Sequence, residues 1–257
     1  FTAIGANLSS MPALMGNTVV WKPSEKAALS AQVLMAVFAE AGFPPGVINL
    51  VHGSGAVVTD RAMQHERFAG LAFTGSTAVF RQLWQKAAAN LDAYRSYPRI
   101  VGETGGKNAV VAHASADPDA LLVALVRGAF EFQGQKCSAA SRAYLPRSLW
   151  SALRERLREE IATIVVGDPT THASFMGAVI DAAAAQRLKG AIEQARSLPG
   201  HEILTGGGVH TDTGWFVEPT VVVSEDPSST FFATEFFGPL LAIHVYDDAD
   251  WERVLRL

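Results

Sequence analysis

The sequence predicts an α/β fold in which a doubly wound parallel sheet is followed directly by a second α/β unit. Short apolar segments alternate with amphipathic helical patterns along the chain, and glycine-rich turns separate them. Apolar residues make up 49% and charged residues 18% of the 257 residues, which is typical of a folded globular protein. Strand–helix alternation at this spacing predicts parallel βαβ units with right-handed crossovers.

The first hundred residues contain the clearest alternation. Strands are expected at residues 18–21, 47–51, 71–73 and 99–102. A helix over residues 27–41 begins after Ser24, whose hydroxyl can cap it, and ends at Gly42. A glycine-bounded helix follows the second strand, and a helix over residues 77–91 follows the turn Thr74-Gly75-Ser76. This alternation predicts that the first hundred residues form the parallel sheet.

The alternation of strand and helix patterns continues after residue 106. Strands are expected at residues 109–111, 221–223 and 240–246, and helices at 118–132, 148–164 and 181–196. No linker or internal repeat separates the two parts, so the boundary is placed near Thr104, between domains 1–104 and 105–257. The chain lacks a starting Met and stops within a helical pattern at 251–257, so both domains are expected to be incomplete parts of a longer protein.

The composition excludes several classes of function. A formal net charge of −4 provides no basic field for nucleic acid or an anionic membrane surface. No apolar run approaches the roughly 18 residues that span a bilayer. The single cysteine predicts a reducing compartment, the cytoplasm or the mitochondrial matrix in a eukaryote. The seven histidines show no ligand spacing and no cysteine pair exists, so no metal site is expected.

Cys137 is the candidate nucleophile. A lone cysteine is usually a small buried hydrophobe, but this one lies in Gly134-Gln135-Lys136-Cys137-Ser138-Ala139. The small residues around it leave room for a substrate carbon to approach the sulfur. Lys136 beside it, and a helix expected to start after it, would both favour the nucleophilic thiolate.

Glu103 is the candidate general base. It lies at the end of an expected strand, in Gly102-Glu103-Thr104-Gly105-Gly106-Lys107. Taken alone it could be a solvated loop carboxylate. Open α/β sheets, however, place their ligands at the carboxyl ends of the strands, where such a base could act.

Other signals are weak when each is taken singly. The turn Thr74-Gly75-Ser76 could hold a phosphate on backbone N–H groups at the start of a helix. Gly53-Ser54-Gly55 lacks the third glycine of a dinucleotide fingerprint. Lys22 and Glu25 could bind a ribose, or could be ordinary surface and capping residues. Of the adjacent Phe236 and Phe237, one is expected in the core and one half-buried.

Together, five ordered segments resemble the aldehyde dehydrogenase family over essentially the whole chain. They are Trp21-Lys22-Pro23-Ser24, Phe73-Thr74-Gly75-Ser76, Glu103-Thr104-Gly105-Gly106-Lys107, Gly134-Gln135-Lys136-Cys137 and Glu235-Phe236-Phe237-Gly238-Pro239. The separation of Glu103 and Cys137 also resembles that of the family's base and nucleophile. The resemblance implies the aldehyde-dehydrogenase fold, with a Rossmann-type NAD-binding domain in residues 1–104 and a catalytic domain in residues 105–257.

Within the family, the likeness is greatest to the members that oxidise L-glutamate 5-semialdehyde, formed from 1-pyrroline-5-carboxylate, to glutamate in proline catabolism. The segments that carry this finer likeness are residues 1–5, 12–17, 97–99, 134–139 and 177–182. It implies a small-molecule aldehyde as the partner, with neither nucleic acid nor membrane, and a homo-oligomer for the full-length protein.

The resemblance also implies a role for each site residue. Lys22 and Glu25 would bind the adenosine ribose of NAD, and Gly75, Ser76 and Thr77 would meet the pyrophosphate. Glu235 would bind the nicotinamide ribose, and Phe237 would pack near the nicotinamide. Cys137 would attack the aldehyde carbon, and Glu103 would activate the water that hydrolyses the thioester. Ser138 would contact the amino-acid end of the substrate.

Two alternatives stay open. One is an NAD-dependent dehydrogenase of another aldehyde, and the other is a non-catalytic protein that keeps the fold. The joint presence of Glu103, Cys137 and Glu235 argues against the second. Family members are roughly twice as long, and Phe1 falls just after the asparagine of their oxyanion hole. Since one such donor contributes about 10²- to 10³-fold in rate, this piece alone is expected to be inactive.

Overall fold

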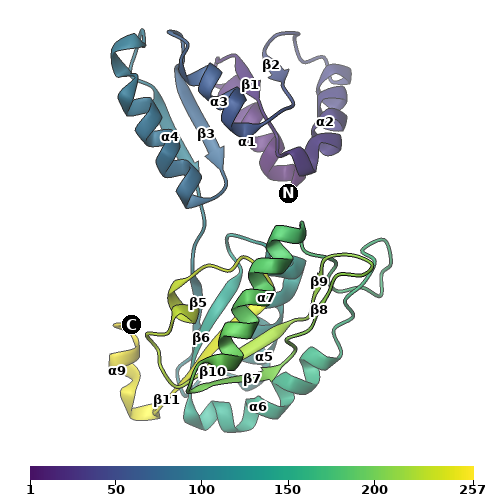
Figure 1. Ribbon diagram of the computed structural model, residues 1–257, viewed down its shortest axis with the longest axis vertical. Coiled ribbons are helices and arrows are strands. Elements are labelled where there is room, and N and C mark those ends of the chain that lie inside the picture. Colours follow the sequence, from purple (N-terminus) through teal and green to yellow (C-terminus); the bar gives the residue numbers. More distant parts are fainter. The chain divides into compact units, whose positions relative to one another are not determined.

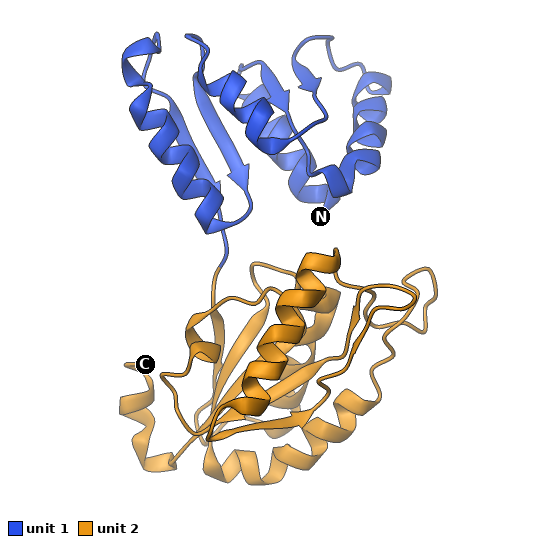
Figure 2. Ribbon diagram, in the orientation of Figure 1, with its two compact units in different colours: residues 1–105 blue, residues 106–257 orange.

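The computed structural model describes residues 1–257, and the chain divides into two compact units. Unit 1 comprises residues 1–105 and unit 2 comprises residues 106–257 (Figure 2). None of the helices combines the length and the apolar composition that crossing a bilayer would require.

The first half of unit 1 contains a parallel pair of strands, β1 (Val19–Trp21) and β2 (Ile48–Leu50). Helix α1 (Thr2–Leu14) precedes them, and the 3₁₀ turn η1 (Glu25–Ala27) and helix α2 (Ala28–Glu40) connect them. The Ser24 hydroxyl accepts the Lys26 N–H at 3.3 Å and so caps η1, whereas α2 begins after Ala27 without a side-chain cap, so the expectation that Ser24 caps this helix was wrong.

The second half of unit 1 repeats this plan. Helix α3 (Gly55–Met63) leads to β3 (Gly70–Thr74), and helix α4 (Thr77–Ala89) with the turn η2 (Leu91–Ala93) connects it to β4 (Arg99–Glu103). Strands β3 and β4 pair in parallel from Gly70 with Arg99 to Thr74 with Glu103. Met63, Leu83 and Ala87 form the small core on which they pack.

The strand pairing of unit 1 differs from the expected single doubly wound sheet. The parallel strands are confirmed, but β1–β2 and β3–β4 form two separate two-stranded sheets (Figure 1). Strand–helix–strand alternation predicts which consecutive strands run parallel, and it does not determine which pairs join into one sheet.

Unit 2 is built on a five-stranded sheet in the order β5-β6-β11-β10-β7. Its strands are β5 (Asn108–Val111), β6 (Ala140–Pro146), β7 (His201–Thr205), β10 (Thr220–Ser224) and β11 (Leu240–Tyr246). All neighbours are parallel except β7, which runs antiparallel to β10 at one edge. Strands β6 and β7 were not expected from the sequence, because their apolar and polar residues do not alternate clearly.

Helices cover both faces of this sheet. Helices α5 (Pro118–Phe130) and α6 (Arg147–Ala162) pack on one face, and α7 (Ala182–Ser197) packs on the other (Figure 1). Asp117 caps α5 by accepting the Ala120 N–H at 2.8 Å, and Asp181 caps α7 by accepting the Ala184 N–H at 2.9 Å. The remaining short elements are η3 (Glu131–Gly134), β8 (Val209–His210), β9 (Phe216–Val217), α8 (Thr230–Ala233), η4 (Asp248–Asp250) and α9 (Trp251–Val254).

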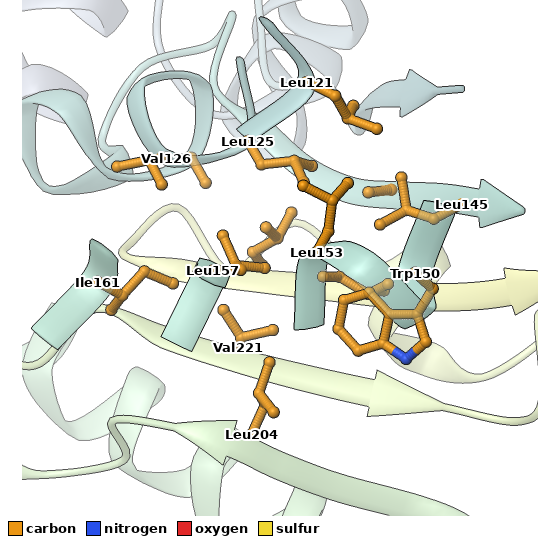
Figure 3. Close-up of a cluster of buried hydrophobic side chains, with 14 of the residues drawn as sticks. Leu121, Leu125, Val126, Leu145, Trp150, Leu153, Leu157, Ile161, Leu204 and Val221 are labelled. Atoms are coloured by element: carbon orange, nitrogen blue, oxygen red, sulfur yellow. The ribbon is translucent and has the colours of Figure 1, made fainter. Parts of the chain in front are cut away.

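The core of unit 2 follows the alternation of side chains along its strands. Leu241 and Ile243 point toward α5 and α6, whereas Leu240 and Ala242 point toward α7. Figure 3 shows the first of these clusters, in which Leu153 and its neighbours interdigitate with the strands. A fully buried leucine of this kind contributes about 1.5–3 kcal/mol. This two-sided core supports the loops that carry the candidate site.

Candidate active site

Two predicted cofactor residues lie at one end of the β1–β2 sheet. Lys22 and Glu25 follow the carboxyl end of β1, and Gly53-Ser54-Gly55 follows the carboxyl end of the parallel strand β2. A Cβ atom on Gly55 would lie 3.7 Å from Lys22 Nζ, so the lysine extends over the start of α3. Glu25 is exposed as the first residue of η1. An ammonium and a carboxylate are thus available together at this edge.

The predicted phosphate turn and Glu103 lie together at the carboxyl end of the β3–β4 sheet. The Gly75 N–H donates to the Glu103 carbonyl oxygen at 3.1 Å. Ser76 caps α4 by accepting the Val79 N–H at 3.3 Å, and Ser76 and Thr77 are both exposed. A Cβ on Gly75 would lie only 2.6 Å from the Phe73 ring, so a larger residue here would have to displace that ring. The exposed start of α4, free of bulky side chains, fits an anionic group.

Cys137 lies on an exposed turn between η3 and β6. The backbone enters this turn through three consecutive left-handed residues, Phe132 (φ 54°), Gln133 (φ 56°) and Gly134 (φ 63°). Non-glycine residues rarely adopt this conformation, so the surrounding contacts must hold it. These residues also end α5 at Phe130, before the expected residue 132.

The expected helix after Cys137 is absent. The Ala139 N–H donates to the Lys136 carbonyl at 3.0 Å in a tight turn, and strand β6 follows directly. The strand must start there to join the central sheet, so no helix dipole acts on the sulfur. Lys136 donates to the Glu131 carboxylate at 2.5 Å, so its charge is already partnered. This ion pair lowers the pKa of Glu131, mainly through the hydrogen bond from Lys136.

Asn108 fixes the backbone of the nucleophile. Its side-chain Nδ2 donates to the Cys137 carbonyl oxygen at 2.5 Å and to the Ala139 carbonyl oxygen at 3.3 Å. Asn108 is the first residue of β5, which pairs with β6. The sheet register therefore places this amide under the turn, and leaves the exposed Ser138 beside Cys137 on its outer side.

The segment Glu235–Gly238 packs against the Cys137 turn. Glu235 Oε1 accepts the Gly106 N–H at 3.1 Å. A Cβ on Gly134 would lie 2.4 Å from the Gly238 carbonyl oxygen, so the two backbones are in close contact. Phe237 has a φ of 49° and is 38% exposed, whereas Phe236 is half-buried with its ring 5.4 Å from that of the buried Phe231. The expectation that one of the two would be a core residue was therefore wrong. One aromatic ring is therefore presented to solvent beside the nucleophile turn.

A small hollow forms where these segments meet. Its lining comprises Gly106, Gly134, Lys136, Ala139, Ser141, Glu235, Phe236, Phe237, Gly238 and Leu240. The hollow lies at the amino ends of β5, β6 and β11, which all run parallel. Open parallel sheets usually bind ligands at the opposite end. The site of unit 2 therefore departs from that rule, whereas the predicted residues of unit 1 follow it.

Lys107 is half-buried next to Phe236, one of the residues that line this hollow. Burial, and then the neighbouring Arg142 guanidinium, lower the pKa of Lys107 to about 8, and Glu235 opposes the shift. Its Nζ lies 5.6 Å from the centre of the Phe236 ring and 3.4 Å from the Ser141 carbonyl oxygen. The protonated form of Lys107 is thus less favourable in the folded chain than in water.

The replacement Lys107→Met is expected to remove a pH dependence of stability. The unfolded chain keeps this proton up to a pKa of 10.5, whereas the folded chain releases it near pH 8. Between these values the unfolded state binds more protons, so the wild type gains about 1–2 kcal/mol from pH 7 to pH 9.5. Thermal unfolding of both proteins at the two pH values measures this gain. An equal response of wild type and variant would show that Lys107 does not cause it.

The structure assembles some of the predicted residues and leaves others in separate units. Cys137, Ser138, Glu235 and Phe237 come together in unit 2, and Lys22, Glu25, Gly75, Ser76, Thr77 and Glu103 belong to unit 1. Glu103 belongs to unit 1 and Cys137 to unit 2, so the expectation that they lie near each other stays a prediction. Sequence reasoning missed the amides of Asn108, Gln133 and Gln135, because their partners lie 29 to 102 residues away.

Comparison with known proteins identifies the family of the chain. Residues 2–254 match the family described as "Aldehyde dehydrogenase family". The chain is 46% identical to the mitochondrial delta-1-pyrroline-5-carboxylate dehydrogenase of Dictyostelium discoideum, with 100% of this chain and 46% of that protein covered. The chain therefore spans about half the length of the curated relatives it matches.

Solved structures show the same similarity. The delta-pyrroline-5-carboxylate dehydrogenase from Mycobacterium tuberculosis bound with NAD is 49% identical with a TM-score of 0.95, covering 100% of this chain and 46% of that one. The 1-pyrroline-5-carboxylate dehydrogenase from Thermus with bound NAD is 32% identical with a TM-score of 0.91, covering 98% and 48%. The family match over nearly the whole sequence shows that this chain belongs to the aldehyde dehydrogenase family.

Proposed function

We propose that this chain is part of an NAD-dependent 1-pyrroline-5-carboxylate dehydrogenase, which oxidises L-glutamate 5-semialdehyde to L-glutamate. One observation carries the proposal: an exposed cysteine, held on a turn beside Glu235 and Phe237, occurs in a chain that matches proteins of that name over its full length. Two such structures contain NAD, which supports the same cofactor here.

The proposed reaction begins at Cys137. Its thiolate attacks the aldehyde carbon, and the carbonyl oxygen becomes the oxyanion of a tetrahedral adduct on sulfur. NAD, when bound, accepts the hydride that this adduct releases. The thioester that remains on Cys137 is hydrolysed when Glu103 takes a proton from a water molecule that attacks the acyl carbon. The thiolate leaves, and glutamate is released.

The other residues bind and orient the reactants. Lys22 and Glu25 would bind the adenosine ribose, and Gly75, Ser76 and Thr77 would face the pyrophosphate at the start of α4. Glu235 would hold the nicotinamide ribose, while the exposed ring of Phe237 would cover the nicotinamide. Ser138, exposed next to the nucleophile, would donate to the amino-acid end of the substrate.

The full-length protein is proposed to work as a homo-oligomer in a compartment that keeps Cys137 reduced. A substrate survey separates the proposal from a different aldehyde dehydrogenase. Glutamate semialdehyde is expected to give the highest kcat/KM of the semialdehydes and simple aliphatic aldehydes tested with the full-length protein. A higher value for another aldehyde would assign a different substrate, and turnover of none would favour a non-catalytic protein.

A preference for NAD over NADP is expected from Glu25. Its carboxylate accepts hydrogen bonds from both ribose hydroxyls, whereas a 2′-phosphate would place two anions together. At about 4 Å and an effective dielectric near 20, that repulsion is roughly 4 kcal/mol, which solvation and ribose movement reduce. We expect NAD to exceed NADP by at least about tenfold in kcat/KM, since 1.4 kcal/mol corresponds to that ratio.

The variants Glu25→Gln and Glu40→Gln test this role. Glu25→Gln is expected to narrow the NAD preference, because the amide no longer repels the phosphate. Glu40, an exposed carboxylate at the far end of α2, serves as a matched control that should leave the ratio unchanged. Equal use of both cofactors by the wild type would contradict the role of Glu25.

A further inference from the structure

Gln135 lies two residues before Cys137, and its buried side-chain amide links two separate segments. The side chain is only 8% exposed. Its Oε1 accepts the Ile180 N–H at 3.1 Å, and its Nε2 donates to the Phe237 carbonyl oxygen at 3.5 Å. One amide therefore joins the nucleophile turn both to the segment before α7 and to the segment that presents Phe237.

The contact with Phe237 lies where the two backbones touch. Gly134 leaves no space for a Cβ against the Gly238 carbonyl oxygen. Phe237 adopts the left-handed region with a φ of 49°, which a bulky residue keeps only when its neighbours hold it. The Gln135 amide is a hydrogen-bond donor to this residue from the side of Cys137. A displacement of either segment would therefore be transmitted to the other.

Gln133 provides an internal comparison. Its Oε1 accepts the Gly177 N–H at 3.2 Å, and its Nε2 donates to the Ala178 carbonyl oxygen at 3.1 Å. Both glutamines thus anchor the same turn with the same chemistry. Only the Gln135 amide also reaches the segment that carries Phe237.

We propose that Gln135 is a positioning residue that couples the Cys137 turn to the cofactor-contacting segment Glu235–Gly238. This role rests on the proposed function, in which Glu235 and Phe237 contact the nicotinamide half of NAD. The Ile180 hydrogen bond fixes the amide in one orientation, so that Nε2 faces the Phe237 carbonyl. Gln135 thereby sets the position of the bound nicotinamide relative to the sulfur.

The variants Gln135→Glu and Gln133→Glu form a matched pair. Each keeps the length of the side chain and its acceptor, and each replaces a donor with a carboxylate oxygen facing a carbonyl. In Gln135→Glu that carbonyl belongs to Phe237, whereas in Gln133→Glu it belongs to Ala178. Both variants should therefore lose similar thermal stability, but only the first should displace the cofactor-contacting segment.

The test uses the full-length protein and measures three quantities. These are the dissociation constant of NAD, the rate of Cys137 alkylation by iodoacetamide followed on its peptide, and the midpoint of thermal unfolding. Gln135→Glu is expected to weaken NAD binding by about tenfold, because an unsatisfied buried acceptor costs an amount of that order. For Gln133→Glu, the dissociation constant of NAD is expected to stay within about twofold of the wild-type value. The rate of Cys137 alkylation should differ from that of the wild type in both variants, because both glutamines hold the turn that carries this cysteine.

The uncharged variant Gln135→Met keeps the test decisive if Gln135→Glu does not fold. It removes the donor without adding a charge, and it is expected to weaken NAD binding by about fivefold. Equal NAD affinities for the Gln135 and Gln133 variants would overturn the coupling and leave the proposed function standing. A wild-type protein that binds no NAD would overturn the proposed function, and the coupling with it.

Discussion

The replacement Cys137→Ala is expected to lower aldehyde oxidation in the full-length protein by at least about 10⁴-fold, because removal of a covalent nucleophile has effects of this size or larger. Cys137 is the sole cysteine of the 257 residues and is exposed on its turn, so no neighbouring thiol in this chain can replace it. Steady-state formation of NADH from glutamate semialdehyde measures the loss. Iodoacetamide should inactivate the wild type, and bound aldehyde should slow that reaction.

The thermal midpoint and the affinity for NAD show whether Cys137→Ala has lost only its nucleophile or has also lost its folded structure. The alanine side chain is smaller than the exposed thiol, so the thermal midpoint and the NAD dissociation constant should remain close to those of the wild type. Retention of more than about a tenth of the wild-type rate would be inconsistent with covalent catalysis at this residue.

The replacement Gly134→Ala is expected to destabilise unit 2 by about 3 kcal/mol or more, through overpacking and backbone strain. The new Cβ would lie 2.4 Å from the Gly238 carbonyl oxygen and 2.7 Å from the Ala129 carbonyl oxygen. The φ of 63° is also unfavourable for a side chain. Because the turn holds Cys137, we expect activity to fall as well, even below the unfolding temperature.

Gly190→Ala is the matched control. Gly190 lies within α7, and a Cβ there would meet no atom within 4 Å. An alanine at an open helical position is expected to stabilise the chain by about 0.5–1 kcal/mol. Thermal unfolding of the two variants should therefore shift in opposite directions. A neutral effect of Gly134→Ala would show that the two segments are not packed as closely as described.

Much of the fold could be predicted from local patterns in the sequence. Strand β11 has the expected bounds, and α6 and α7 differ from their expected bounds by one or two residues at each end. Their apolar residues repeat with the period of the element, and capping residues such as Asp181 mark their ends. Strand β6 was missed because its apolar and polar residues do not alternate clearly, and because a helix was expected directly after Cys137. The antiparallel strand β7 has polar residues at an edge, and its pairing with β10 depends on distant residues.

The exposed residues of the candidate site could be predicted from the sequence, whereas the side chains that hold them in place could not. Cys137, Glu235 and Phe237 lie in short motifs whose residue types already indicate chemistry. Gln135 lies in the Cys137 motif and Asn108 directly follows the Glu103 motif, but an amide side chain has no preferred partner in a sequence. Only the register of β5 with β6 places Asn108 against the Cys137 carbonyl. Lys136 was expected to favour the thiolate of Cys137, and its charged partner in the structure is Glu131, the first residue of η3.

The most direct test of the account is the detection of an acyl group on Cys137. Glu103→Gln in the full-length protein should form the thioester but hydrolyse it slowly, because the amide cannot take a proton from water. Mixed with glutamate semialdehyde and NAD, it should release one NADH per active site in a burst. Mass spectrometry should then find a glutamyl group on the peptide that contains Cys137. An unmodified Cys137 during undiminished turnover, or an acyl group on another residue, would contradict the account.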